Sequence, residues 1–185
     1  GSDLTTSANF AGGDGNDVLT GGTGDDTLSG QAGNDTITGG DGDDVIVGNA
    51  GDDIISGGTG DDFISGGLGA DIFAGGLGKN IFEFDLGAGD TGLSAARDII
   101  TDFDETTDQI EFSDLIEFNF VGSYASGSEI DFNTTDTAST TASGRFNSST
   151  KILEIDIDND QVIDAEIELR NADLGAENFI LASTA

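Results

Sequence analysis

From Gly12 to Glu83 the chain reads GGDGNDVLT, GGTGDDTLS, GQAGNDTIT, GGDGDDVIV, GNAGDDIIS, GGTGDDFIS, GGLGADIFA and GGLGKNIFE. These are eight consecutive units of nine residues, with no insertion between them. The eighth place of every unit is large and apolar, and the sixth place is aspartate in every unit except the last, which carries Asn80. A period kept this strictly is typical of stacked repeats rather than of an ordinary globular core.

Each unit predicts a glycine-rich turn followed by a strand of three residues. Glycine at the first, second and fourth places permits positive φ and a close approach of the backbone to a ligand. The last three places, such as Val18-Leu19-Thr20, would point outward, inward and outward in turn. Two units, or 18 residues, would make one flattened coil, and successive coils would stack at about 4.8 Å into a parallel sheet on each side. We therefore expect an all-β fold.

Such a stack needs a further source of stability. Only one inward side chain per unit fills the space between the sheets, which is little apolar burial for the backbone that must be ordered. Stacking also brings the aspartates of units n and n+2 close together, which adds repulsion. A hard divalent cation would turn that repulsion into attraction, and a flexible set of about six or more carboxylate and carbonyl oxygens suits Ca²⁺ better than Mg²⁺. Calcium binding would then be coupled to folding.

The composition excludes several classes of function. The 185 residues include 37 acidic and five basic side chains, a formal net charge of −32, which repels nucleic-acid phosphates and anionic lipids. Because the chain has no histidine and no cysteine, it cannot build a Ser-His-Asp or Cys-His nucleophile, a zinc site of nitrogen and sulfur ligands, or a disulfide. The sequence has no apolar run of about 18 residues. We expect neither a nucleic-acid partner nor membrane insertion.

Two other interpretations of the repeat fit it less well. A disordered acidic linker would have no reason to keep an apolar eighth place through eight units. An ice-binding surface would need a continuous row of threonines, whereas the third place reads Asp14, Thr23, Ala32, Asp41, Ala50, Thr59, Leu68 and Leu77.

The GGxGxDxUx pattern of these units resembles the nonapeptide repeat of the RTX family. The resemblance implies a right-handed parallel β-roll that binds Ca²⁺ in the turns between units n and n+2. Eight units offer six such pairs, and we expect about five to seven ions in all. The carboxylate ligands would be Asp17, Asp26, Asp35, Asp44, Asp53, Asp62 and Asp71. The turn carbonyls would come from Gly13, Gly15, Gly22, Gly24, Gly33, Gly40, Gly42, Gly51, Gly58, Gly60, Gly67 and Gly69. Secondary ligands would be Asn16, Asp25, Asn34, Asp43, Asp52 and Asp61.

Several units depart from the pattern. Gln31 and Asn49 replace the second glycine, and Ala70, Lys79 and Asn80 weaken the seventh and eighth turns. We expect the sites nearest Lys79 to be weak or empty.

The period is lost from Phe84, and residues 84–185 carry 22 acidic and four basic side chains. Alternating β-formers predict short strands at 98–103 and 109–112, joined by a turn at 105–108, and a hairpin built from 151–157 and 162–169. Residues 122–149 should be loops with weak strands. We expect three regions: an entry segment at 1–11 that begins with a tag remnant, the roll at 12–83, and a C-terminal flank at 84–185.

The C-terminal flank has a resemblance of its own. The runs RDIITDFDETTDQIEFSDL, KILEIDIDNDQVIDAEIEL and LGAENFIL are similar to the C-terminal region of serralysin-type metalloproteases and of the R-modules of mannuronan C-5-epimerases. That similarity implies an antiparallel β cap on the roll. It also implies an uncleaved type I secretion signal, which Glu177-Asn178-Phe179-Ile180-Leu181 resembles, although four residues follow it.

Two acid clusters outside the repeats are further candidate metal sites. Asp156, Asp158, Asp160 and Asp164 follow the 1, 3, 5, 9 spacing of a calcium loop, but Gln161 and Ile167 stand where glycine and glutamate are expected. A solvated hairpin turn is the alternative there. Asp98, Asp102, Asp104 and Asp108 could close a site at the end of the roll, or could be strand-edge charges that discourage aggregation.

The outward seventh place becomes more apolar along the roll. Its residues are Val18, Thr27, Thr36, Val45, Ile54, Phe63, Ile72 and Ile81. Exposed aliphatic rows are unusual unless they are covered. We expect the C-terminal segment to pack over this end of the roll; a partner-binding face is the alternative.

These inferences favour a calcium-responsive, non-catalytic module of a larger secreted protein. The resemblance implies export by a type I secretion apparatus of a Gram-negative bacterium, folding in extracellular Ca²⁺, and stabilisation of an N-terminal effector. We expect a monomer. The alternative is a module that binds an anionic polysaccharide such as alginate, although only Lys79, Arg97, Arg145, Lys151 and Arg170 are basic. An enzymatic function is the least favoured, because the obvious acid clusters are better explained by calcium.

Overall fold

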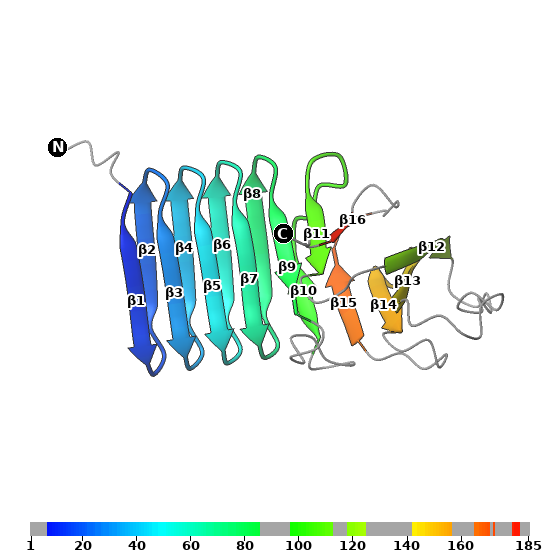
Figure 1. Cartoon of the computed structure of the whole chain (residues 1–185), viewed down its shortest axis with the longest axis horizontal. Helices are drawn as coiled ribbons and strands as arrows, with labels where there is room; N and C mark the ends of the chain where they lie inside the picture. Colours follow the sequence, from blue (N-terminus) through cyan, green and yellow to red (C-terminus); the bar gives the residue numbers. More distant parts are fainter. Residues whose placement is uncertain are drawn as a thin grey trace.

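The structure is a computed structural model that describes residues 7–85, 97–112, 118–124, 142–156, 165–170, 172 and 179–181. It is an elongated stack of β-coils along which the chain advances from β1 toward the C-terminal strands (Figure 1). Every regular element in the described residues is a strand, and they include no helix long and apolar enough to cross a bilayer. The expected all-β fold is confirmed.

The roll contains nine strands; β1 begins three residues before the first unit, and each later strand begins at the seventh place of a unit. They are β1 Asn9–Asp14, β2 Val18–Thr23, β3 Thr27–Ala32, β4 Thr36–Asp41, β5 Val45–Ala50, β6 Ile54–Thr59, β7 Phe63–Leu68, β8 Ile72–Leu77 and β9 Ile81–Phe84. The first eight have six residues each, so the prediction of three-residue strands was wrong. The strand continues through the first three places of the next unit, because those residues also pair with the next coil, as in Gly22↔Gly40 and Thr23↔Asp41.

Odd-numbered and even-numbered strands of the roll lie in two separate sheets. One runs β1-β3-β5-β7-β9 and the other β2-β4-β6-β8, and neighbours within each are parallel. Paired residues are two units apart, as Leu28 and Ile46 are. One coil therefore consists of two units, and the predicted parallel β-roll is confirmed.

The core is a single column of apolar side chains between the two sheets. The eighth-place residues from Leu28 to Phe82 are each at most 1% exposed. Toward the C-terminus the column becomes aromatic: the Phe73 ring lies 6.2 Å from Phe82 and 6.0 Å from Phe84, and Phe84 lies 6.5 Å from Phe112. The larger rings extend the core beyond the last repeat.

Parallel stacking does not stop at Glu83. The later strands are β10 Asp98–Ile100, β11 Gln109–Phe112, β12 Phe118–Tyr124, β13 Ala142–Asn147, β14 Ile152–Asp156, β15 Ala165–Leu169 and β16 Phe179–Leu181. Strand β10 adds in parallel to β8, and β11 adds in parallel to β9. Among the described strands, antiparallel pairing joins only β13, β14 and β15. The antiparallel cap is confirmed, with β14 and β15 paired as predicted, but it follows one further parallel layer of the stack; residues 157–164 between the two strands lie outside the described residues.

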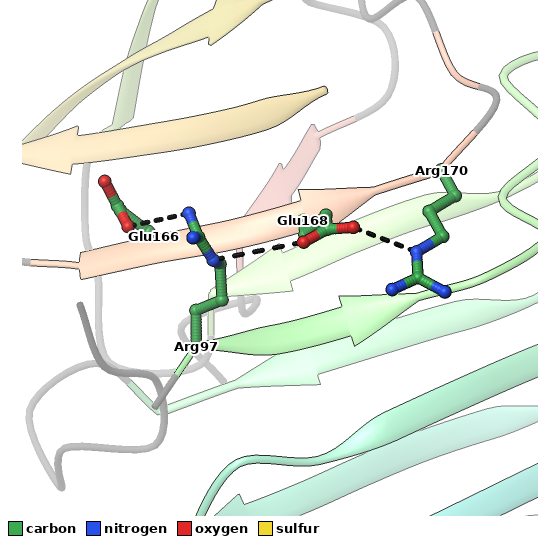
Figure 2. A network of polar contacts seen from close by, with 4 residues as sticks. All are labelled: Arg97, Glu166, Glu168 and Arg170. Atoms are coloured by element: carbon green, nitrogen blue, oxygen red, sulfur yellow. Dashed lines mark hydrogen bonds and ion pairs between the residues drawn. The ribbon is translucent and has the colours of Figure 1, made fainter. Parts of the chain in front are cut away.

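An ion-pair network joins the roll to this cap. Arg97, which directly precedes β10, binds Glu166 of β15 at 2.9 Å and approaches Glu168 at 4.0 Å. Arg170 binds the other oxygen of Glu168 at 2.9 Å. Figure 2 shows the four side chains along β15. Because β10 and β15 pair in parallel, these contacts link the two strands side by side.

The apolar seventh-place row is only partly covered. Val45, Ile54 and Ile72 are 42%, 53% and 39% exposed, whereas Phe63 and Ile81 are half-buried. The expectation that the C-terminal segment packs over this end of the roll is therefore wrong for Ile54 and Ile72; the described C-terminal strands extend the two sheets at their edges.

Candidate metal centre

The sixth-place aspartates form two hydrogen-bonded columns inside the roll. In each column the backbone N–H of one aspartate donates to Oδ1 of the aspartate two units later, as from Asp17 to Asp35 and from Asp35 to Asp53, both at 2.7 Å. The side chains from Asp26 to Asp71 are at most 2% exposed. This ladder points every sixth-place carboxylate inward and fixes its orientation.

The second carboxylate oxygen has no hydrogen-bond partner. This holds for Oδ2 of Asp17, Asp26, Asp35, Asp44, Asp53, Asp62 and Asp71. A buried oxygen of this kind is costly unless it receives a proton or a cation. The same oxygen is buried without a partner in seven consecutive units. This regularity favours a cation bound in the turns over a local packing defect.

The first-place glycine lets the backbone approach each of these oxygens closely. A β-carbon on Gly12 would lie 2.6 Å from Asp17 Oδ2 and 2.8 Å from the Gly30 carbonyl oxygen. The same two oxygens, the unit's own Oδ2 and the first-place carbonyl of unit n+2, lie closest to this position at Gly12, Gly21, Gly30, Gly39, Gly48 and Gly57. At Gly66 and Gly75 a phenylalanine ring takes the place of the carbonyl among the nearest atoms.

The turn glycines direct further carbonyls along the stack. All twelve second- and fourth-place glycines predicted as carbonyl ligands have positive φ, between 92° at Gly67 and 150° at Gly69. A β-carbon on Gly40 would collide with the Gly22 carbonyl oxygen, and one on Gly42 would lie 2.5 Å from the Gly24 carbonyl oxygen. Carbonyl and carboxylate oxygens are the ligands that Ca²⁺ prefers, so the donor set fits this ion.

The electrostatics of the columns also favour a cation. Burial, reinforced by the neighbouring carboxylates of the same column, raises the pKa of Asp53 and of Asp62 to about 6 and that of Asp71 to about 7. Burial likewise raises the pKa of Asp44. Charged carboxylates that are buried and stacked without counterions are unfavourable. A divalent ion between them would compensate their charge and so stabilise the charged form.

The fifth-place residues lie on the other side of the turn. Asn16, Asp25, Asn34, Asp43, Asp52 and Asp61 are all exposed. Each accepts the backbone N–H of the fifth-place residue two units later, as Asp25 does from Asp43 at 3.0 Å and Asp43 does from Asp61 at 2.8 Å. The structure therefore places these predicted secondary ligands on the solvent face, separate from the inward Oδ2 atoms.

The predicted end site does not gather into one cluster. Asp98 accepts the N–H of Asp71, and the two oxygens of Asp102 accept the N–H groups of Gly75 and Gly76. Asp104 accepts the N–H and hydroxyl of Thr106, while Asp108 accepts from Asn80 and Asp104. Each carboxylate thus holds a different piece of backbone, and within the described residues no three acidic side chains come together around a metal position. For the other candidate site, Asp158, Asp160, Asp164 and the side chain of Asp156 lie outside the described residues.

Two features of the site were missed in the sequence. First-place glycine was predicted to have positive φ, but positive φ occurs at the second and fourth places instead. At the first place glycine makes room for the sixth-place side chain to approach the backbone, and its presence in all eight units was the available signal. Asp98 and Asp108 were assigned to an end site, whereas they continue the two aspartate columns. Their distances of 27 and 28 residues from Asp71 and Asn80 hide that relation from any search for an 18-residue interval.

The described basic side chains do not form a strip. Arg97 and Arg170 are paired with glutamates. Lys151 donates to the Ala172 carbonyl at 2.8 Å and lies over the Phe146 ring. Lys79 is exposed in the last turn of the roll. An anionic polymer would therefore find no row of available cations on this part of the chain.

A parallel β-roll whose turns bring buried, unpartnered carboxylate oxygens close to backbone carbonyls has the features of a cation-binding repeat module. The family model of the RTX calcium-binding nonapeptide repeat, in four copies, matches residues 11–46 and again 47–82. The roll is therefore similar along its whole length to RTX repeats, which bind calcium.

Two solved structures from Azotobacter vinelandii mannuronan C5-epimerase are similar to the chain. The AlgE6R3 subunit is 24% identical, with 94% of this chain and 82% of that chain covered and a TM-score of 0.37. The AlgE6R2 subunit is 22% identical, with 100% and 98% covered and a TM-score of 0.35. At these TM-scores the likeness carries no functional assignment. No curated protein matches the chain.

Proposed function

We propose that this chain is a calcium-binding module that folds when Ca²⁺ binds and that serves a larger secreted protein without catalysing a reaction itself. The observation that supports it best is the series of buried, unpartnered Oδ2 atoms in seven consecutive units. In the absence of a cation these atoms oppose folding, and with one they favour it, because the bound state exists only when the coils are stacked.

The proposed ligands are the sixth-place carboxylates and the turn carbonyls of units n and n+2. Six first-place glycines, from Gly12 to Gly57, lie next to both an Oδ2 and a first-place carbonyl oxygen, in line with about five to seven ions. The fifth-place side chains would bind only secondarily, since they lie outside the turn.

The cellular setting is part of the proposal. Calcium would be scarce in the cytosol, so the acidic chain would stay unfolded for a type I exporter and fold outside the cell. The absence of cysteine agrees with a secreted module in which calcium takes the place of disulfides. We further propose a monomer that stabilises an effector domain N-terminal to it.

The test compares the secondary structure of the chain with and without calcium. Far-UV circular dichroism should change from an unfolded spectrum in chelator to a β spectrum in millimolar Ca²⁺, and millimolar Mg²⁺ should not reproduce the change. A complete β spectrum in chelator at neutral pH would falsify the coupling of folding to calcium.

Two neighbouring asparagine substitutions test which carboxylates bind. Asp44→Asn and Asp43→Asn both keep the Oδ1 acceptor of their ladder and remove one negative charge. Asp44→Asn should raise the Ca²⁺ concentration at the folding midpoint by about tenfold or more, because it replaces an inward oxygen. Asp43→Asn, on the solvent face, should change it by less than about twofold. Equal effects would contradict the assignment of the sixth place as the principal ligand.

A further inference from the structure

The two aspartate columns of the roll end differently. One column contains Asp17, Asp35, Asp53, Asp71 and then Asp98, and the other contains Asp26, Asp44, Asp62, Asn80 and then Asp108. Every member of the first column is a carboxylate. The second column has an amide at its fourth place.

Hydrogen bonding fixes the orientation of the Asn80 amide. Its Oδ1 accepts the backbone N–H of Asp62 at 3.2 Å, so Nδ2 must occupy the inward position that Oδ2 takes in the other units. Nδ2 is buried without a hydrogen-bond partner, and Asn80 is 0% exposed. An amide NH₂ carries only donors and cannot coordinate a cation.

The surroundings of the first-place glycine also differ between Asn80 and the earlier members of its column. A β-carbon on Gly57 would lie 2.7 Å from the Gly75 carbonyl oxygen, with Asp62 Oδ2 beside it. A β-carbon on Gly75 would instead meet Asn80 Nδ2 at 2.6 Å and the Phe82 ring at 2.9 Å. The two oxygens next to Gly57 are thus replaced, next to Gly75, by the Nδ2 donor of Asn80 and by the Phe82 ring.

The next member of the column is already satisfied by the backbone. Asp108 accepts the N–H of Asn80 with Oδ1 at 3.0 Å and the N–H of Asp104 with Oδ2 at 2.9 Å. Gln109 N–H donates in turn to the Asn80 carbonyl at 2.9 Å. The formal charge of the fifth and sixth places is also +1 in Lys79-Asn80, compared with −2 in Asp61-Asp62.

We propose that Asn80 ends the calcium array along this edge of the roll and that the roll is joined there to β11 by hydrogen bonds and aromatic packing alone. The inference rests on the proposed function, since it concerns which places of the array take an ion. Asn80 thus determines where the metal array ends. The two edges of the roll hold unequal sets of ligands, and the last coil on this edge closes without an ion.

Serine substitutions at positions 62 and 80 test the proposal by counting ions. Native mass spectrometry of the whole chain in saturating Ca²⁺ should show the same number of ions in Asn80→Ser as in the wild type. Asp62→Ser, the matched change one step earlier in the same column, should show one ion fewer. Loss of an ion in Asn80→Ser would overturn the proposal, because the side-chain oxygen of Asn80 would then be a ligand.

The other outcomes separate the two claims. If the wild type binds no Ca²⁺, the proposed function fails. If Asp62→Ser keeps every ion while the wild type binds them, the assignment of the sixth-place ligands fails. Should Asn80→Ser not fold, a crystal structure of the wild type grown in Ca²⁺ decides: an ion coordinated by Asn80 overturns the proposal, and its absence there, with ions at earlier places of the column, supports it.

Discussion

Two residues of the roll, Gln31 and Asn49, hold a backbone conformation that the other units give to glycine. Their φ angles are 85° and 84°, in a region that is unfavourable for residues with a β-carbon. Asn49 has compensation, because its amide donates to Ser29 Oγ at 3.1 Å and to the Gly48 carbonyl at 3.0 Å. The same departure from the repeat pattern therefore has different consequences in the two units.

We predict that Gln31→Gly stabilises the calcium-bound roll by about 0.5–1 kcal/mol, since the relief of strain exceeds the added freedom of the unfolded chain. Asn49→Gly should be neutral or destabilising, because it removes the amide hydrogen bonds. Urea unfolding in saturating Ca²⁺ measures both. A Gln31→Gly variant that is less stable than Asn49→Gly would contradict the explanation by strain.

Short strands at the junction with the cap rely on side chains to stay in place. Strand β10 has three residues and lies between β8 and β15. The Arg97–Glu166 pair crosses this junction, and both side chains are mostly buried, 20% and 15% exposed. The Arg170–Glu168 pair has a similar distance but lies along one strand, and Arg170 is 53% exposed.

A double-mutant cycle compares these two ion pairs. Alanine at positions 97 and 166 should give a coupling energy on the order of 1 kcal/mol, because the pair joins two strands and is partly shielded from water. Alanine at positions 168 and 170 should give a few tenths of a kcal/mol at most, since Arg170 is 53% exposed and the pair lies along one strand. Calcium-saturated thermal or urea unfolding supplies the data, and a larger coupling for the second pair would show that β10 is held by other contacts.

At the scale of the whole molecule, the columns of buried carboxylates make stability depend on pH. In the folded chain without calcium the pKa is about 6 for Asp53 and Asp62 and about 7 for Asp71, compared with about 4 for an unfolded aspartate. A pKa raised by folding contributes stability that is fully present below the unfolded pKa and is lost as the pH rises through the folded pKa.

We therefore predict that in calcium-free buffer the β content is higher at pH 5 than at pH 8. Protons replace the absent cations at the lower pH, and the buried charges return between about pH 6 and 7. Asp71→Asn should weaken this pH dependence, because an amide stays neutral throughout. Circular dichroism against pH in chelator checks it, and a β content that rises with pH would refute the role assigned to buried charge.

The repeat itself was predictable because its interactions are local and periodic. A strict nine-residue period with an apolar eighth place leaves one regular way to bury Leu28, Ile37 and Ile46 together, so the parallel coil of two units followed from the sequence. The need for a cation followed as well, since aspartates at a fixed place in each unit must stack when the coils stack. The exact strand length did not follow, because the pairing of the first three places depends on the neighbouring coil.

The tertiary structure alone decided what happens where the period fails. That Asp44 faces inward and Asp43 faces solvent agrees with the ranking of the sixth place above the fifth, which in the sequence rested on the family resemblance. Asp98 and Asp108 join the columns through contacts across 27 and 28 residues, which no local pattern encodes. The sequence determined the repeating unit and its demand for calcium, because these are properties of one turn and its copies. The ends of the ion array and the placement of the C-terminal strands were decided by long-range packing, where single residues such as Asn80 determine the outcome.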